Sequence, residues 1–194
     1  MYIYFGRGNR KLDRKILTWS LPVGLTCIGA GKCAEYCYAK KAERHPVVRT
    51  SRIKNYKTSL SPEFPKLAIE VIKRSKRKFV RVHVSGDFYS QEYVDKWAQI
   101  ASALPDVTFL AYTKAHILDF SKLPDNFILF RSVGGQWDHL IREDDNIAIV
   151  ISEKDVPLFI RDWFICSVKR NHCLQNCNHC FMHGKRKRVA FIKH

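Results

Sequence analysis

Cysteine is the residue type in this sequence with the clearest capacity for chemistry. The chain has 194 residues and seven cysteines, and all of them fall in two short groups. The first group has the spacing C-x5-C-x3-C, and the second has the spacing C-x6-C-x3-C-x2-C. The members are Cys27, Cys33 and Cys37 in the first group, and Cys166, Cys173, Cys177 and Cys180 in the second. An odd number of thiols cannot be fully paired in disulfides, so this clustering indicates metal ligation or catalysis.

The first group supplies three ligands and leaves a fourth position open. A structural zinc site takes four ligands in a closed tetrahedron, but no histidine follows these cysteines before His45. Iron–sulfur clusters are held by cysteine thiolates, and three of them leave one iron free for an exogenous ligand. We therefore expect an open [4Fe–4S] cluster here. A zinc ion completed by a distant residue and buried, unligated thiols are the alternatives.

The second group can saturate a metal centre by itself, because it places four thiols within fifteen residues. The C-x2-C element is typical of both zinc and cluster sites. We expect an auxiliary [4Fe–4S] cluster, with zinc as the alternative, so that the chain holds one or two clusters.

The elements that must position these thiols alternate between strand and helix patterns. Strand patterns occupy residues 15–22, 78–88, 106–116, 126–135, 146–155 and the end of 158–167; helix patterns occupy 61–77 and 90–104. Repeated strand–helix units predict a parallel sheet covered by helices. Six strands in a chain of this length favour a partial (βα)6 TIM-like barrel over a closed one of about 250 residues. A flat doubly wound sheet is the alternative.

We expect residues 1–165 to form the barrel and residues 166–194 to form a cysteine-rich extension packed on the same domain. Each predicted strand is followed by a polar or thiol-bearing segment, among them "SGDF", "YTKAH", "RSVGG" and "SEKD". The carboxyl ends of parallel strands lie at one rim of a barrel. The sequence therefore predicts that these segments and both cysteine groups meet at one active site.

The charge balance indicates a polyanionic partner. The chain has 34 Lys and Arg against 18 Asp and Glu, a formal net charge of +16. Such a field attracts nucleic acid and speeds its encounter, so we expect a nucleic acid or a nucleotide as partner. The apolar runs are far shorter than the roughly 20 residues that span a bilayer, and the N-terminus has no signal-peptide pattern. We therefore expect no membrane association and a cytoplasmic location.

Four stretches of the sequence resemble the phage gene product 88 family. They are "SLPVGLTCIGAGKCAEYCYAKKAE", "RVHVSGDFYSQEYVDKWAQIA", "FLAYTK" and "CNHCFMHGKRKRVAFIKH". The family combines a three-cysteine loop, a GDF motif and a cysteine-rich C-terminal end. This resemblance implies a protein encoded by a phage or another mobile element and made in a bacterial host cell.

The first cysteine group is also similar to that of radical S-adenosylmethionine (SAM) enzymes. These enzymes carry three cysteines on the loop after the first strand of a (βα)6 partial barrel, with an aromatic residue before the last cysteine. Tyr36 takes the place of that aromatic residue here. The usual spacing there is C-x3-C-x2-C, whereas this loop has C-x5-C-x3-C.

This resemblance implies a cofactor and residues that bind it. The open iron would chelate the amino and carboxylate groups of SAM, and an electron from a reducing partner would release a 5′-deoxyadenosyl radical. Ser85, Gly86 and Asp87 correspond to the Gly-Gly-Glu motif that holds the SAM amino group. By their position at strand ends, the candidates for contact with the carboxylate and the ribose are Thr113, Lys114, Arg131, Ser132 and Ser152.

The sequence thus leads to a radical-SAM-like iron–sulfur enzyme acting on a nucleic acid or nucleotide. Two alternatives remain. One is a non-radical [4Fe–4S] enzyme that uses the open iron directly. The other is a basic, metal-stabilised nucleic-acid-binding module without catalysis.

Overall fold

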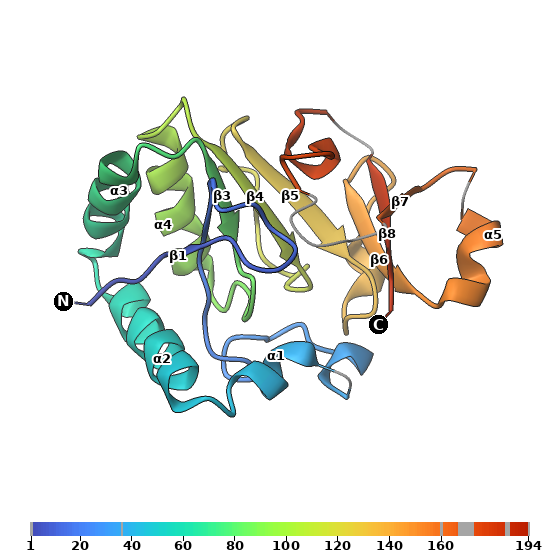
Figure 1. Ribbon diagram of the computed structural model, residues 1–194, viewed down its shortest axis with the longest axis horizontal. Helices are drawn as coiled ribbons and strands as arrows, with labels where there is room; N and C mark the ends of the chain where they lie inside the picture. The colour runs from blue at the N-terminus through green and yellow to red at the C-terminus, as the bar shows by residue number, and fades with distance from the viewer. Residues whose placement is uncertain (1, 36, 160, 167–172, 185–186, 194) are drawn as a thin grey trace.

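The computed structural model describes residues 2–35, 37–159, 161–166, 173–184 and 187–193 (Figure 1). Its strands are β1 (Gly6–Arg7), β2 (Ile16–Thr18), β3 (Phe79–Val82), β4 (Thr108–Thr113), β5 (Phe127–Ser132), β6 (Ile147–Ile151), β7 (Phe164–Cys166) and β8 (Arg188–Ile192). Its α-helices are α1 (Tyr38–Ala42), α2 (Pro46–Leu60), α3 (Phe64–Ser75), α4 (Gln91–Ser102) and α5 (Val156–Phe159). Short 3-10 helices are η1 (Lys32–Ala34), η2 (Asp138–Leu140), η3 (Glu153–Asp155) and η4 (His179–Phe181).

The strands form one eight-stranded sheet in the order β1-β2-β3-β4-β5-β6-β8-β7. β1 pairs with β2 in antiparallel fashion, and every other neighbouring pair is parallel. The protein is therefore a mixed α/β fold with a mostly parallel sheet, as predicted. From β2 to β6 the spatial order follows the chain order, without the reversal that defines a doubly wound sheet.

Several elements of the fold, among them β8 and α2, were not predicted from the sequence. β8 lies within the segment 166–194, where we expected only a cysteine-rich extension, and it inserts between β6 and β7. The helix α2 was missed because the side chains that it buries are polar, namely Arg52, Asn55, Thr58 and Ser59. A helix whose inward face is polar shows no apolar periodicity.

The helices α3 and α4 pack together and cover one face of the sheet (Figure 1). Strand side chains such as Val80, Val82 and Phe109 point to this face and meet Phe64 of α3 and Trp97 of α4. Ser90 is the N-cap residue of α4, and its hydroxyl accepts a hydrogen bond from the Tyr93 amide at 3.2 Å. This helix face forms the larger of two apolar cores.

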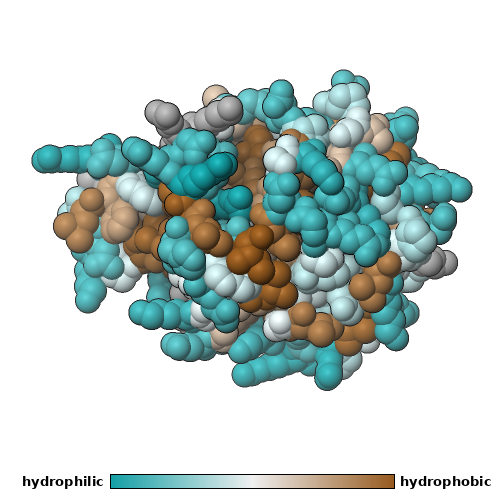
Figure 2. All heavy atoms as spheres, turned by 180° about the vertical axis from the view of Figure 1, so that it is seen from behind, coloured by the Kyte–Doolittle hydropathy of each residue, from teal (hydrophilic) through white to brown (hydrophobic). Residues whose placement is uncertain are grey.

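The other face of the sheet forms a second core with the C-terminal segment. Ile16, Leu110 and Phe130 alternate with the residues of the helix face, and they pack with Cys166 and Phe181. Polar side chains cover most of the surface seen from behind, and apolar side chains gather in a smaller area near its middle (Figure 2). No helix in the described ranges is long and apolar enough to cross a membrane.

Candidate metal centres

The first cysteine group lies on the loop that leaves the carboxyl end of β2. A turn precedes it, with Gly24 at φ +76° and the Cys27 amide donating to the Gly24 carbonyl at 3.1 Å. The buried Thr26 hydroxyl donates to the Pro22 carbonyl at 2.7 Å. Cys33 sits in η1, and Cys37 is the N-cap residue of α1. Each thiol is thus held by a different local structure.

The long spacing between Cys27 and Cys33 has a structural reason. A Cβ at Gly29 would stand 1.9 Å from the Lys114 carbonyl oxygen. Because glycine has no side chain, the loop backbone can pack directly against the backbone at the end of β4. Ala30 forms an antiparallel bridge with Gly135, and the Gln136 amide donates to the Gly29 carbonyl at 3.1 Å. The additional residues therefore dock the loop on the ends of β4 and β5.

The two glycines after β5 serve this docking and form a turn. The amides of Gly134 and Gly135 donate to the two carboxylate oxygens of Asp138 at 2.7 and 2.9 Å. A carboxylate of the chain itself therefore occupies the donors that an anion would use.

A partly buried ion pair holds both ends of the cysteine loop. Arg52 Nη1 of α2 donates to Glu43 Oε1 at 3.0 Å and to the Ala39 carbonyl at 3.1 Å. Glu43 Oε1 also accepts from the Val23 amide at 2.9 Å. Val23 precedes the loop and Ala39 follows it, so this pair closes the loop at its base.

The predicted Ser85, Gly86 and Asp87 lie beside this loop. The Ser85 hydroxyl donates to the Leu21 carbonyl at 2.8 Å. Gly86 has φ +77°, and a Cβ there would approach the Thr26 hydroxyl oxygen to 2.6 Å. This segment is therefore shaped to let the cysteine loop pass close to the end of β3.

Asp87 joins the ends of β3 and β4. Its Oδ1 accepts from the Phe88 amide and the Thr113 hydroxyl, each at 2.7 Å, and its Oδ2 accepts from the Lys114 amide at 2.8 Å. Burial raises the pKa of Asp87 to about 6, although these hydrogen bonds lower it. The resemblance to SAM enzymes implies that the Asp87 carboxylate binds the SAM amino group. In this structure the same carboxylate already accepts hydrogen bonds from Phe88, Thr113 and Lys114.

Lys114 and Ser132 belong to the same network. Lys114 Nζ donates to the Ser132 hydroxyl at 2.8 Å, the Ser132 carbonyl at 3.1 Å and the Val133 carbonyl at 2.5 Å. Burial lowers the pKa of the Lys114 ammonium, whereas the nearby Cys33 thiolate raises it. The side chain of Lys114 therefore places a positive charge beside the first cysteine group.

Two of the predicted residues take local roles instead. The Arg131 guanidinium lies 4.7 Å from the centre of the Phe120 ring, and its Nε is 3.8 Å from Asp145 Oδ2. Ser152 caps η3, where its hydroxyl donates to Asp155 Oδ2 at 2.6 Å. Tyr36 lies outside the described residues.

The three thiols of the first group interact electrostatically. Burial raises the pKa of the Cys27 thiol to about 11, and the charges of Asp87, Cys37 and Cys33 add to this increase. In the described part of the chain, no three or more His, Cys, Asp or Glu side chains are gathered tightly enough to hold a metal ion.

The second cysteine group packs on the face of the sheet opposite α3 and α4, where Cys166, Cys173 and Cys180 meet the second apolar core. Its meeting with the first group at one rim stays a prediction. The Cys173 amide donates to the Lys11 carbonyl at 3.5 Å, just before β2 begins. Phe181 of η4 packs edge-on against Phe79, the first residue of β3, at 5.4 Å. His179 stacks at 4.1 Å on Phe164, the first residue of β7.

These contacts tie the segment that carries Cys173, Cys177 and Cys180 to the beginnings of β3 and β7. Cys166, in contrast, is the last residue of β7, and Cys180 forms a hydrogen bond with Tyr112 near the carboxyl end of β4. The second group therefore extends along a face of the sheet and does not lie at one end of its strands.

The four thiols of the second group also interact with one another. Burial raises the pKa of Cys166 to about 12, with contributions from Cys180, Cys173 and Cys177. Burial likewise raises the pKa of Cys173 to about 11. All seven cysteines are free of disulfides, so three and four thiols remain as two donor sets of the kind that cluster or zinc sites use.

Arg81 and Tyr112 lie next to the second group and were not anticipated. The Arg81 guanidinium stacks 3.9 Å from the centre of the Tyr112 ring, and its Nε is buried without a hydrogen-bond partner. Burial raises the pKa of Cys180, while the hydrogen bond with the Tyr112 hydroxyl and the charge of Arg81 lower it. The signal in the sequence was an arginine between Val80 and Val82 of an apolar strand.

Comparison with known proteins places these features in a family. The family model described as gene product 88 matches residues 4–193. The chain is 26% identical over 200 residues to the gene 88 protein of Mycobacterium phage D29, covering 87% of this chain and 82% of that protein. It is 30% identical over 155 residues to the gene 88 protein of Mycobacterium phage L5, covering 72% of this chain and 58% of that protein. No solved structure matches the chain. The chain belongs to the gene product 88 family.

Proposed function

We propose that this protein is an iron–sulfur enzyme of radical-SAM-like type that acts on a nucleic acid or nucleotide. In this proposal Cys27, Cys33 and Cys37 hold a [4Fe–4S] cluster with one open iron. The observation that carries the proposal is the docking of the three-cysteine loop, after the first parallel strand, on the ends of β3, β4 and β5.

The proposed fold is a partial (βα) barrel. The sequential order of the parallel strands β2 to β6 supports it, because a barrel winds in one direction. The sheet would then present the carboxyl ends of its strands as one shallow rim around the loop.

When bound, such a cluster would supply the electron that cleaves SAM. The residues of the chain would position the ligands and limit the access of water. Lys114, held by three acceptors of β5 and its following turn, places a fixed positive charge beside Cys33. Fixed charges of this kind stabilise an anionic thiolate site without reorganisation during the reaction.

The second centre has a structural role in this proposal. Cys166, Cys173, Cys177 and Cys180 would hold a second cluster or a zinc ion and tie the C-terminal segment to the amino ends of β2 and β3. A saturated four-thiolate centre contributes to folding and leaves no position for a substrate.

One observation favours the readings without SAM. Asp87 already accepts three hydrogen bonds from Phe88, Thr113 and Lys114. A non-radical enzyme that uses the open iron directly needs no free carboxylate at this position. A metal-stabilised nucleic-acid-binding module likewise needs none.

Anaerobic reconstitution with iron and sulfide, followed by reduction with dithionite and addition of SAM, tests the proposal. We expect formation of 5′-deoxyadenosine by the wild type and none by Cys37→Ala. A wild-type protein that is fully loaded and reduced, yet forms no 5′-deoxyadenosine, would overturn the radical-SAM proposal.

A further inference from the structure

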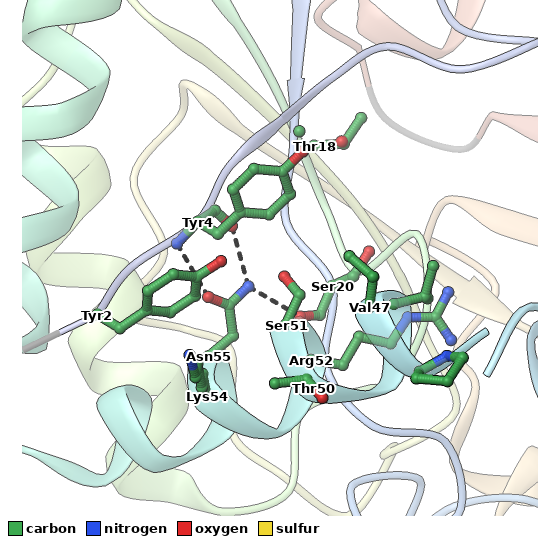
Figure 3. Close-up of a pocket in the computed structure, with 13 residues that line it drawn as sticks. Tyr2, Tyr4, Thr18, Ser20, Val47, Thr50, Ser51, Arg52, Lys54 and Asn55 are labelled. Carbon is green, nitrogen blue, oxygen red and sulfur yellow. Dashed lines mark hydrogen bonds between the residues drawn. The ribbon is translucent and has the colours of Figure 1, made fainter. Parts of the chain in front are cut away.

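A groove of about 590 Å³ lies between the N-terminal segment and α2 (Figure 3). Tyr2 and Tyr4 line it on one side, and Thr50, Ser51 and Lys54 of α2 line it on the other. Among the described residues that line the groove there is no Asp or Glu. Its surface therefore combines aromatic rings, hydroxyl groups and positive charge.

The two tyrosine rings are exposed although their backbone is fixed. The relative exposure of Tyr2 is 42% and that of Tyr4 is 52%. The Tyr4 amide donates to Asn55 Oδ1 at 3.0 Å, and Asn55 Nδ2 donates to the Tyr4 carbonyl at 2.9 Å (Figure 3). The Thr58 hydroxyl donates to the Tyr2 carbonyl. Because the backbone is anchored, a flat ligand can stack on these rings without first ordering the segment.

The segments that form the groove are strongly basic. Residues 39–60 contain seven Lys and Arg against one acidic residue, and residues 2–15 contain five against one. Glu43 is engaged by Arg52 and Val23, and Asp13 is buried and accepts from the Lys15 amide at 2.7 Å. Of the two basic side chains that line the groove, Arg52 is paired with Glu43, and Lys54 is available to an external anion.

We propose that this groove binds single-stranded nucleic acid, with bases stacked on Tyr2 and Tyr4 and phosphates beside α2. Exposed aromatic rings next to a basic track are the features that bind unpaired bases and their backbone. A duplex offers phosphates but keeps its base faces stacked inside. Lys54 Nζ, 4.9 Å from the centre of the Tyr2 ring, is placed to contact a phosphate next to a stacked base.

The groove is connected to the first cysteine group. Arg52 lines the groove and also forms the ion pair that closes the cysteine loop. A strand in the groove would therefore lie beside the wall that supports the proposed active site. Binding of a single strand in the groove needs no cluster. The groove proposal rests on the proposed function only where it takes the bound strand to be the substrate of the enzyme.

Fluorescence anisotropy with labelled oligothymidylate and oligouridylate of about ten nucleotides tests the groove. We expect Tyr2→Ala/Tyr4→Ala to weaken binding at least about tenfold, because each lost stack lowers affinity by about that factor. Tyr2→Phe/Tyr4→Phe should bind like the wild type. Lys54→Gln should reduce the slope of log Kd against log salt by about 0.7.

Two exposed residues outside the groove provide matched controls. Leu158→Ala removes an apolar side chain that is 79% exposed on α5, and Lys122→Gln removes one positive charge near Asp95. Both controls should leave the affinity within about twofold of the wild type, as surface changes away from a site do. Circular dichroism and thermal unfolding verify that each variant is folded.

Groove variants that bind single strands as tightly as the wild type would overturn the proposal, as would tighter binding to a duplex of equal length. SAM cleavage is measured on the same preparations. If the groove variants lose binding but the wild type does not cleave SAM, the proposed radical-SAM chemistry is wrong and the proposed binding of single strands in the groove is supported. If SAM is cleaved but the groove variants bind normally, the groove proposal fails alone.

Discussion

Arg52 and Glu43 form an ion pair of 3.0 Å whose side chains are only 10% and 17% exposed. Through this pair, α2 holds the backbone on both sides of the three-cysteine loop, at Val23 and at Ala39. The helix that lines the groove thus also determines where the thiols lie.

Arg52→Met should lower the free energy of unfolding by about 2 kcal/mol, because it leaves the partly buried Glu43 carboxylate without its cationic partner and with only the Val23 amide as donor. Adding Glu43→Gln should recover part of this loss. Urea denaturation measures both values. The exposed pair Lys122–Asp95 is the control, and Lys122→Met should change stability by less than about 1 kcal/mol. If Arg52→Met and Lys122→Met lowered the free energy of unfolding equally, the proposed role of the Arg52–Glu43 pair in holding the cysteine loop would be contradicted.

Gly29→Ala should reduce the iron bound by the first group, because its Cβ would lie 1.9 Å from the Lys114 carbonyl and must displace the loop. Gly24→Ala is the matched control, since it has φ +76° but no atom within 4 Å of its Cβ. It should cost about 1 kcal/mol in backbone strain and leave iron binding intact. Iron content after anaerobic reconstitution compares the two variants, and equal iron loss would contradict the docking.

The sequence was sufficient to predict the strands β3 to β6, because apolar residues mark each of them. It also located the SGD segment and Lys114 beside the first cysteine group, since parallel strands bring their carboxyl ends together. It missed α2, whose buried side chains are polar, and β8, whose place between β6 and β7 depends on tertiary pairing. The sequence did not show that the second cysteine group packs against the sheet face that carries Arg81 and Tyr112, because that contact depends on tertiary packing.

Arg81→Met should weaken metal retention by the second group. The Arg81 charge lowers the pKa of Cys180 and Cys173, so its removal disfavours the thiolates that bind metal. Loss of such an outer partner typically lowers metal affinity by about 10–100-fold. Competition with a chelator measures this affinity. Lys78→Met, just before the same strand and 62% exposed, is the control and should leave it unchanged; similar losses in both variants would count against a specific role of Arg81.

His83→Asn should reduce the loss of stability below neutral pH. Burial lowers the pKa of His83 to about 3, so the unfolded chain binds a proton below the ordinary pKa of about 6.5 and the folded chain does not. The stability from neutral His83 is therefore present above pH 6.5 and is lost as the pH falls toward 3, by up to about 1.4 kcal/mol per pH unit. Asn also tolerates the φ of +62° at this position.

The measurement is the free energy of unfolding of both proteins between pH 5 and 7. Asp87 acts in the opposite sense, because its raised pKa of about 6 adds stability as the pH falls. The difference between the wild type and His83→Asn cancels this contribution. An unchanged slope in the variant would show that His83 is not the group responsible.

The central claim is that Cys27, Cys33 and Cys37 hold an iron–sulfur cluster independently of the second group. Iron and acid-labile sulfide per chain, determined on protein purified without oxygen, test it most directly. Replacing these three cysteines by alanine should remove about four iron and four sulfide ions, while the metal of the second group stays bound. A wild-type protein without iron, or a triple variant with the same iron content as the wild type, would contradict the account.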